Sequence, residues 1–245
     1  MRTDLLRNHA SCSGVNSAQQ TNQNAGILFV YYTIFIMGEG GMANQRNYAR
    51  ELSALIEESE KAGRVPRLLL HACCAPCSSY CLEYLARYFS VTVLYYNPNI
   101  SPQEEYEKRA AELKRLIGEM PLPHQVTFVE GKYEPERFYE MAKGLETVPE
   151  GGERCFRCYR LRMEEAARLA RVGGYDYFTT TLSISPLKNA GKINEIGEEL
   201  AEIYEVKHLP SDFKKKNGYK RSIELSREYG LYRQDFCGCV YSRKR

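Results

Sequence analysis

The 245-residue sequence has no tryptophan, little net charge and no apolar run long enough to cross a membrane as a helix. Its formal charge is +3, and its hydrophobic fraction of 43% and charged fraction of 27% are ordinary for folded domains. These values exclude collagen-like, coiled-coil and disordered chains. Nine cysteines are also too few for a short secreted disulfide scaffold. The length fits one large domain or two small ones.

Residues 1–41 differ in composition from the rest. Residues 1–24 are rich in Asn, Gln and Ser, and the apolar run that follows at 26–37 is shorter than the roughly 20 residues of a membrane helix. This run also lacks the basic start and the cleavage site of a signal peptide. We predict that residues 1–41 are a disordered or dispensable extension, which leaves His9 and Cys12 outside the functional chain. Residues 42–245 are then expected to form a single α/β catalytic domain in the cytoplasm, with no membrane partner.

Strand and helix patterns alternate from residue 47 onward. Strands are predicted at 67–71, 91–96, 126–129 and 177–182, and helices at 47–62, 78–88, 102–117, 135–143, 156–171 and 193–203. This alternation predicts a parallel sheet with helices on both faces. Ligands of such sheets bind beyond the carboxyl ends of the strands. The loops at 71–78 and 183–189 should therefore lie together.

Apart from Cys12, the cysteines form three groups. They are Cys73, Cys74 and Cys77 with Cys81 a turn later, Cys155 with Cys158, and Cys237 with Cys239. Because a structural zinc takes four ligands, seven thiols suggest a cluster and something else. An adjacent Cys-Cys pair reaches two corners of an iron–sulfur cubane more easily than it reaches one small ion, and Cys155 and Cys158 could supply the other two. Cys81 is expected to be a buried packing residue.

The Cys237-Gly-Cys239 sequence favours a redox-active dithiol. Residues two apart can come within disulfide distance, and Gly238 permits the sharp turn. A second metal site, or two unreacted thiols near a cofactor, are the alternatives. Cys77 has three possible roles: it could hold an extra metal, take part in catalysis or face the cofactor.

Positive charge is concentrated near the C-terminal end of the sequence. Residues 207–245 hold 11 Lys and Arg against 4 Asp and Glu, a net charge of +7, which leaves −4 for residues 1–206. Such a segment is typical of a surface that meets phosphate, and a solvated helix face is the alternative.

Five motifs in this order resemble those of a known family. They are Leu70-His-Ala-Cys-Cys-Ala-Pro-Cys-Ser78, Tyr96-Asn-Pro-Asn99, Glu153-Arg-Cys-Phe-Arg-Cys-Tyr-Arg160, Thr180-Thr-Leu-Ser-Ile-Ser-Pro-Leu-Lys-Asn189 and Tyr232-Arg-Gln-Asp-Phe-Cys-Gly-Cys-Val-Tyr-Ser242. Together they resemble the cobalamin-independent epoxyqueuosine reductase family (QueH). The resemblance runs from about residue 67 to residue 242. It implies a nucleotide-alpha-hydrolase-like (PP-loop/HUP-like) α/β fold, here with a C-terminal basic, Cys-containing extension.

The resemblance also implies an activity and its cofactors. Epoxyqueuosine in the wobble position of a tRNA anticodon loop would be reduced by two electrons to queuosine, with a small electron-transfer protein as reductant. The implied [4Fe-4S] ligands are Cys73, Cys74, Cys155 and Cys158, and the implied redox pair is Cys237 and Cys239. An additional mononuclear iron beside the cluster is implied as well, and Cys77 is a candidate ligand or catalytic thiol.

A tRNA substrate would explain the basic segment. Cations bind phosphates while aromatic side chains such as Phe213 and Tyr219 stack unpaired bases. The expected tRNA-binding cations are Lys215, Lys216, Lys220 and Arg221. Ser185, Lys188 and Asn189 are expected to contact the nucleoside or a phosphate, and a helix N-cap followed by surface polar residues is the alternative.

Two other functions compete with the reductase. A zinc-stapled RNA-binding module would explain the basic segment and some cysteines, and a tRNA-thiolating enzyme would use a similar scaffold. The loop after the first strand lacks the Ser-Gly-Gly-x-Asp-Ser pattern of an ATP pyrophosphatase, which argues against the thiolating enzyme. The proton donor is undecided among His71, Tyr96 and Asp235, and His71 is better explained as a packed or supporting residue.

Overall fold

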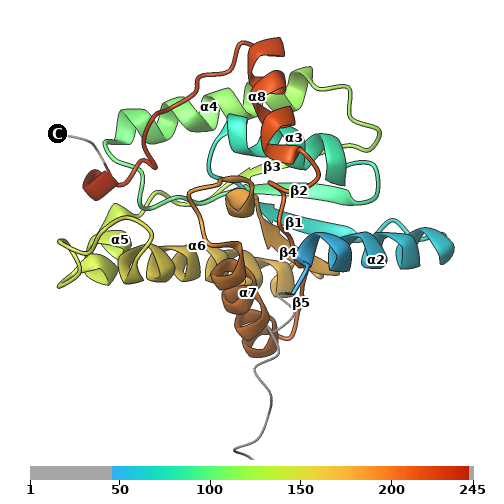
Figure 1. The fold of residues 1–245 in the computed structure, drawn as a ribbon, viewed down its shortest axis with the longest axis horizontal. Helices are drawn as coiled ribbons and strands as arrows, with labels where there is room; N and C mark the ends of the chain where they lie inside the picture. Colours follow the sequence, from blue (N-terminus) through green and yellow to red (C-terminus); the bar gives the residue numbers. More distant parts are fainter. Residues whose placement is uncertain (1–45, 243–245) are drawn as a thin grey trace, which may run out of the picture. The chain divides into compact units, whose positions relative to one another are not determined.

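The computed structural model describes residues 46–242, so the predicted N-terminal extension lies outside the described residues. Five parallel strands form one sheet in the order β3-β2-β1-β4-β5 (Figure 1). They are β1 (Arg67–His71), β2 (Ser90–Tyr95), β3 (Thr127–Glu130), β4 (Tyr177–Thr180) and β5 (Lys207–His208). The predicted parallel α/β sheet is confirmed. Among residues 46–242, no helix has the length and hydropathy of a membrane span.

Helices cover both faces of the sheet (Figure 1). They are α2 (Tyr48–Lys61), α3 (Ala75–Leu85), α4 (Gln103–Glu119), α5 (Pro135–Ala142), α6 (Glu153–Val172), α7 (Ala190–Tyr204) and α8 (Gly218–Glu228). On one face, buried residues of α2, α3 and α4 pack on Leu68, Leu70 and Val93. On the other, α6 and α7 pack on Leu69, Leu94 and Phe178. Because alternate strand residues face opposite layers, these strands are apolar on both sides.

The topology places the site between β1 and β4. The chain runs from β1 outward to β2 and β3, and then returns to the other side of β1 to form β4. Such a reversal opens a crevice at the carboxyl ends of the two central strands. The Sγ of Cys73, after β1, lies 3.8 Å from Oγ1 of Thr181, after β4. Lys188 in the loop at 183–189 also interacts electrostatically with Cys73 and Cys77 in the loop at 71–78, so the predicted meeting of these two loops is confirmed.

Three predicted helices begin earlier than expected, among them α7, which begins at Ala190 rather than at residue 193. α3 begins at Ala75 rather than at residue 78, with Cys74 in extended conformation as its N-cap and Pro76 in its first turn. Proline is favoured there because the first backbone N–H groups of a helix have no acceptor within the helix, so an N–H that proline lacks is not missed. The predicted Ser78 cap is wrong, because the Ser78 hydroxyl donates to the Cys74 carbonyl at 2.8 Å instead of accepting from a backbone N–H. α6 begins at Glu153, so its first two turns carry Cys155 and Cys158.

The region after residue 205 holds two elements that the sequence pattern did not predict. β5 has two residues, too few for a recognisable apolar run. α8 begins at Gly218, where an added Cβ would lie 2.0 Å from the Phe213 carbonyl oxygen and 2.4 Å from Tyr80. This close approach packs α8 against α3. The predicted strand at 177–182 also ends early, because Thr181–Ile184 form a 3₁₀ turn.

Candidate metal and redox site

Cys73, Cys74 and Cys77 bring their sulfur atoms together at the junction of β1 and α3. The three Sγ atoms all lie within 4.8 Å of one another, and those of Cys73 and Cys74 are 3.7 Å apart. Cys73 and Cys74 are buried, and Cys77 is partly buried. The positive end of the α3 dipole is adjacent, which favours negative charge on the thiols. This triad could hold a metal ion.

Hydrogen bonds within the triad concentrate negative charge on one sulfur. Hydrogen bonds from Cys74 and Cys77 lower the pKa of Cys73 well below its usual range. The same contact with Cys73 raises the pKa of Cys74 to about 12 and also raises that of Cys77. Gln234 Nε2 donates to Cys74 Sγ at 3.0 Å. Since the thiolate is the metal-binding form, the triad contains one prepared ligand and two that metal binding would deprotonate.

A second group of four thiols lines a pocket next to the triad. Cys155 and Cys158 come from α6, and Cys237 and Cys239 come from the segment after α8. The remaining lining residues are Phe138, Glu150, Arg154, Tyr159, Arg162, Lys188 and Ser242. Burial raises the pKa of Cys158 to about 12 and that of Cys239 to about 11. All eight described cysteines are thiols in this structure.

Three cations that line this pocket have no carboxylate partner among the described residues: Arg162, Lys188 and Arg154, which donates to backbone carbonyls instead. Arg162 is 1% exposed, its Nε donates to the Cys158 carbonyl at 3.1 Å, and its Nη2 has no partner. Neither Arg162 nor Lys188 forms an ion pair with any carboxylate of the described residues. A buried cation needs a compensating negative charge, which the thiols or a bound anionic group can supply here.

Lys188 connects the two thiol groups electrostatically. Burial opposes its charge, but attraction to Cys237, Cys73 and Cys77 outweighs burial and raises the pKa of Lys188. One ammonium group therefore acts on thiols from the triad and from the pocket. The structure thus brings the seven predicted thiols to one region, in a group of three and a group of four.

The other predicted contacts of this loop have local partners. Asn189 is the N-cap of α7, and its Oδ1 accepts from the Lys192 backbone N–H at 3.0 Å. Ser185 Oγ accepts from the Leu187 backbone N–H at 3.3 Å. The helix-cap alternative for Asn189 is confirmed, and substrate contacts of Ser185 and Asn189 stay a prediction.

The basic segment is only partly available to a polyanion. Phe213 is 3% exposed and packs in the core, so the prediction that it stacks bases is wrong. Lys214 pairs with Asp212, and Arg221 Nη2 lies 2.6 Å from Glu83 Oε1. The exposed cations of this segment without an ion pair among the described residues are Lys207, Lys215, Lys216, Lys220, Arg227 and Arg233.

His71 is poorly suited to give up a proton. Its Nδ1 lies 2.8 Å from Thr180 Oγ1 and its Nε2 lies 3.1 Å from the Tyr96 carbonyl oxygen. Burial, and then the charge of Arg162, lowers the pKa of His71 to about 4. The imidazole is therefore neutral at neutral pH and supports the end of β1, which agrees with the supporting role favoured from the sequence.

The other two proton-donor candidates differ in exposure. The Tyr96 hydroxyl accepts from Arg137 Nη1 at 2.8 Å and lies 3.4 Å from Glu134 Oε2, and burial raises the pKa of Tyr96 to about 12. Asp235 is exposed. Neither is singled out as the donor.

Sequence reasoning missed three residues that touch the thiols or their backbone: Arg109, Arg162 and Gln234. Arg162 could have been found, because it lies four residues after Cys158 and hence on the same helix face. Arg109 and Gln234 meet the thiol segments across 128 and 160 residues, respectively, and no local pattern indicates such contacts.

Comparison with known proteins identifies relatives of this chain. The family model described as "Epoxyqueuosine reductase QueH" matches residues 68–245. A protein named epoxyqueuosine reductase QueH from Staphylococcus epidermidis is 45% identical over 206 residues, which cover 82% of this chain and 87% of that protein. Its counterpart from Streptococcus pyogenes is 44% identical, over 82% of this chain and 80% of that protein. The counterpart from Thermotoga maritima is 38% identical, over 71% of this chain and 89% of that protein. The comparisons support neither the zinc-stapled module nor the thiolating enzyme.

Proposed function

Since this chain belongs to the epoxyqueuosine reductase QueH family, we propose that it reduces epoxyqueuosine to queuosine in the wobble position of tRNA. The observation that carries this proposal is the meeting of thiols from three distant parts of the chain at the carboxyl edge of the sheet, beside the buried Arg162 and the partly buried Lys188. Thiol-rich redox chemistry at a ligand-binding edge is what an epoxide reductase needs.

The residues fit an anionic metal centre. In our proposal Cys73, Cys74, Cys155 and Cys158 hold a [4Fe-4S] cluster, and Cys77 is a ligand of an adjacent mononuclear iron. Support comes from the unpartnered Nη2 of Arg162 and from the Lys188 ammonium, since a thiolate-bound cluster would supply the negative charge that both lack. When bound, the metals would supply single electrons and a Lewis acid.

The dithiol can be the source of both electrons, which a bound metal centre would transfer singly. Closing Cys237 and Cys239 to a disulfide releases two electrons and two protons. Both C–O bonds of the epoxide break, the carbon–carbon double bond forms, and the oxygen leaves as water. A small electron-transfer protein then reduces the disulfide. Gly238 has φ +101°, a conformation that glycine adopts without strain, and this turn keeps the two cysteines close in the chain.

Cations of this chain serve substrate binding in the proposal. Lys188, at the pocket, stabilises negative charge that develops on the departing oxygen. Lys215, Lys216, Lys220 and Arg221 meet the tRNA backbone. Arg221 does so at the cost of its ion pair with Glu83. Ser185 and Asn189 contact the nucleoside.

Single-turnover reduction tests this function. Protein purified without oxygen is expected to be brown and to contain iron, and under dithionite it should convert epoxyqueuosine-containing tRNA to queuosine-containing tRNA. Colourless protein with stoichiometric zinc, or iron-replete protein that yields no queuosine, would contradict the proposal.

A further inference from the structure

Residues 232–239, which we name the C-terminal strap, lie along α4 without forming a helix or strand of their own. The Tyr232 backbone N–H donates to Glu112 Oε1 at 2.8 Å, and the Tyr232 hydroxyl lies 3.2 Å from both carboxylate oxygens of Glu105. The strap is therefore held by side chains of α4 rather than by a backbone ladder.

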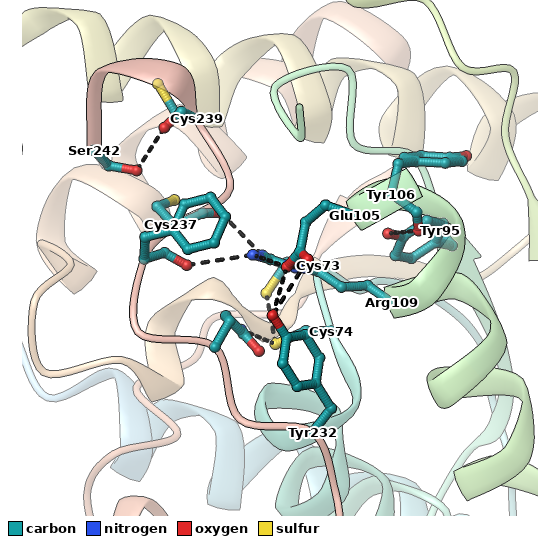
Figure 2. Close-up of polar contacts among 12 residues, drawn as sticks. Cys73, Cys74, Tyr95, Glu105, Tyr106, Arg109, Tyr232, Cys237, Cys239 and Ser242 are labelled. Carbon is teal, nitrogen blue, oxygen red and sulfur yellow. Dashed lines mark hydrogen bonds and ion pairs between the residues drawn. The ribbon is translucent and has the colours of Figure 1, made fainter. Parts of the chain in front are cut away.

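Arg109 of α4 contacts the backbone of Cys237 (Figure 2). Its side chain is 2% exposed, and its Nε donates to Glu105 Oε1 at 2.7 Å. Its Nη1 donates to the Cys237 carbonyl at 3.2 Å, and its Nη2 donates to the Phe236 carbonyl at 3.4 Å. A planar guanidinium can hold two successive carbonyls at once, whereas an ammonium has no such fixed fork.

Close packing fixes the turn between the cysteines against the same side chain. The Gly238 carbonyl accepts from the Ser101 backbone N–H at 3.0 Å. A Cβ added to Gly238 would lie 2.9 Å from Ile100 Cγ1 and 3.1 Å from Arg109 Nη1. The backbone of the turn therefore has no room to move toward α4.

These contacts specify the backbone on each side of Cys237. We propose that Arg109 is a positioning residue for Cys237 and Cys239, which keeps both thiols in the pocket that Cys155 and Cys158 also line. The contacts of Arg109 with the Phe236 and Cys237 carbonyls determine the positions of the two sulfur atoms before the disulfide forms. The functional importance of this placement rests on the proposed redox role of the pair, whereas the placement itself can be measured without turnover.

Thiol reactivity in the purified, oxygen-free protein tests the proposal. Arg109→Gln is expected to raise the rate at which iodoacetamide alkylates Cys237 by about tenfold, the factor that corresponds to about 1.4 kcal/mol. Cys155, in the same pocket but on α6, is the internal reference: as a proposed cluster ligand it should stay protected from alkylation in both the wild type and the variant. Arg109→Lys keeps the charge without the fork, so an intermediate rate is expected.

A matched control is Lys114→Gln on the same helix. Lys114 pairs with Glu130 at the exposed surface and touches no residue of the strap, so its removal should leave Cys237 unchanged. An unchanged Cys237 rate in folded Arg109→Gln would overturn the proposal. Equal acceleration at Cys155 and Cys237 would also overturn it, because Arg109 would then act only on general stability.

Tyr232→Phe keeps the test decisive if Arg109→Gln does not fold. It removes the hydroxyl that approaches Glu105, the carboxylate partner of Arg109. We expect a smaller increase, again confined to Cys237, and no increase would overturn the proposal. If alkylation accelerates only at Cys237 but the wild-type protein does not reduce epoxyqueuosine, the positioning role of Arg109 is supported and the proposed function fails.

Discussion

The thiols of the triad and those of the C-terminal strap are held in opposite ways. Cys73, Cys74 and Cys77 sit between a central strand and the first turn of a helix, where backbone hydrogen bonds fix the chain. Cys237 and Cys239 sit on irregular backbone that side chains of α4 hold. Metal ligands need a fixed geometry, whereas a dithiol that closes and opens must let its sulfur atoms move. The difference suggests metal binding for the first region and redox cycling for the second.

The largest expected effect comes from removing a thiol of the triad. Cys73→Ala should abolish iron binding and the visible absorption, because it removes one of the three sulfur atoms that lie within 4.8 Å of one another. We expect single-turnover reduction to fall by more than about 100-fold, since loss of even an outer-shell partner costs 10–100-fold. Iron content and the yield of queuosine measure the two effects.

Cys81→Ala is the matched control for this variant. Cys81 is also buried near the triad, but its Sγ donates to the Cys77 carbonyl at 3.3 Å and it is not among the metal-competent group. The variant should keep its iron and lose only about 1 kcal/mol of stability. Iron loss in Cys81→Ala equal to that in Cys73→Ala would contradict the division of roles.

Cys237→Ser and Cys239→Ser test the C-terminal strap. Each should retain wild-type iron content and visible absorption while multiple-turnover activity falls by at least about 100-fold, because one hydroxyl cannot form the disulfide. Iron analysis and steady-state assays of the same samples separate the two regions. Iron loss in either variant would indicate that this cysteine is a metal ligand, and the two regions would then not differ in role.

Charge reversal of Lys215 and Lys216 should have an intermediate effect, and it tests whether tRNA is bound outside both thiol regions. The double Glu variant is expected to lower the slope of log affinity against log salt by about one unit per lysine. Salt-dependent binding of tRNA measures it. Lys214→Gln, whose partner Asp212 already satisfies the charge, is the control and should change the slope less. Unchanged binding at low salt would exclude this surface.

The smallest expected effect lies where the two regions touch. Gln234 of the strap donates to Cys74 Sγ at 3.0 Å. A hydrogen bond to a ligand sulfur tunes the potential of a metal centre. Gln234→Met should therefore lower the midpoint potential of the iron centre by a few tens of millivolts, equivalent to about 1 kcal/mol, with no loss of iron. Redox titration checks this, and an unchanged potential would mean that the strap does not tune the centre.

The sequence predicts the sheet and the thiols well because both have local signals. β1 is found as Arg67–His71, and the meeting of the loops after β1 and β4 follows from the parallel topology alone. The start of α3 is missed because Pro76 and Cys74 replace the expected serine cap. Local propensity gives an N-cap preference, but tertiary packing decides which residue takes the position.

The remaining errors concern contacts between distant segments. Phe213 was expected to meet RNA because it is next to lysines, but the packing of α8 buries it. Arg109 looks like an ordinary helix cation, since its partner Glu105 is four residues away, and only the fold brings the Cys237 carbonyl to it. Such roles depend on which surfaces meet, and a single sequence does not record that.

The unpaired guanidinium of Arg162 and the ammonium of Lys188 affect the lifetime of the protein as well as its chemistry. A chain that never received its metal would keep the buried charge of Arg162, and Lys188 beside it, with only the thiols to compensate them. Binding of an anionic centre stabilises only the folded state, so unloaded chains would unfold more often. In a cell, transiently unfolded chains are removed by proteases. These two side chains would thereby couple survival of the polypeptide to successful cofactor delivery.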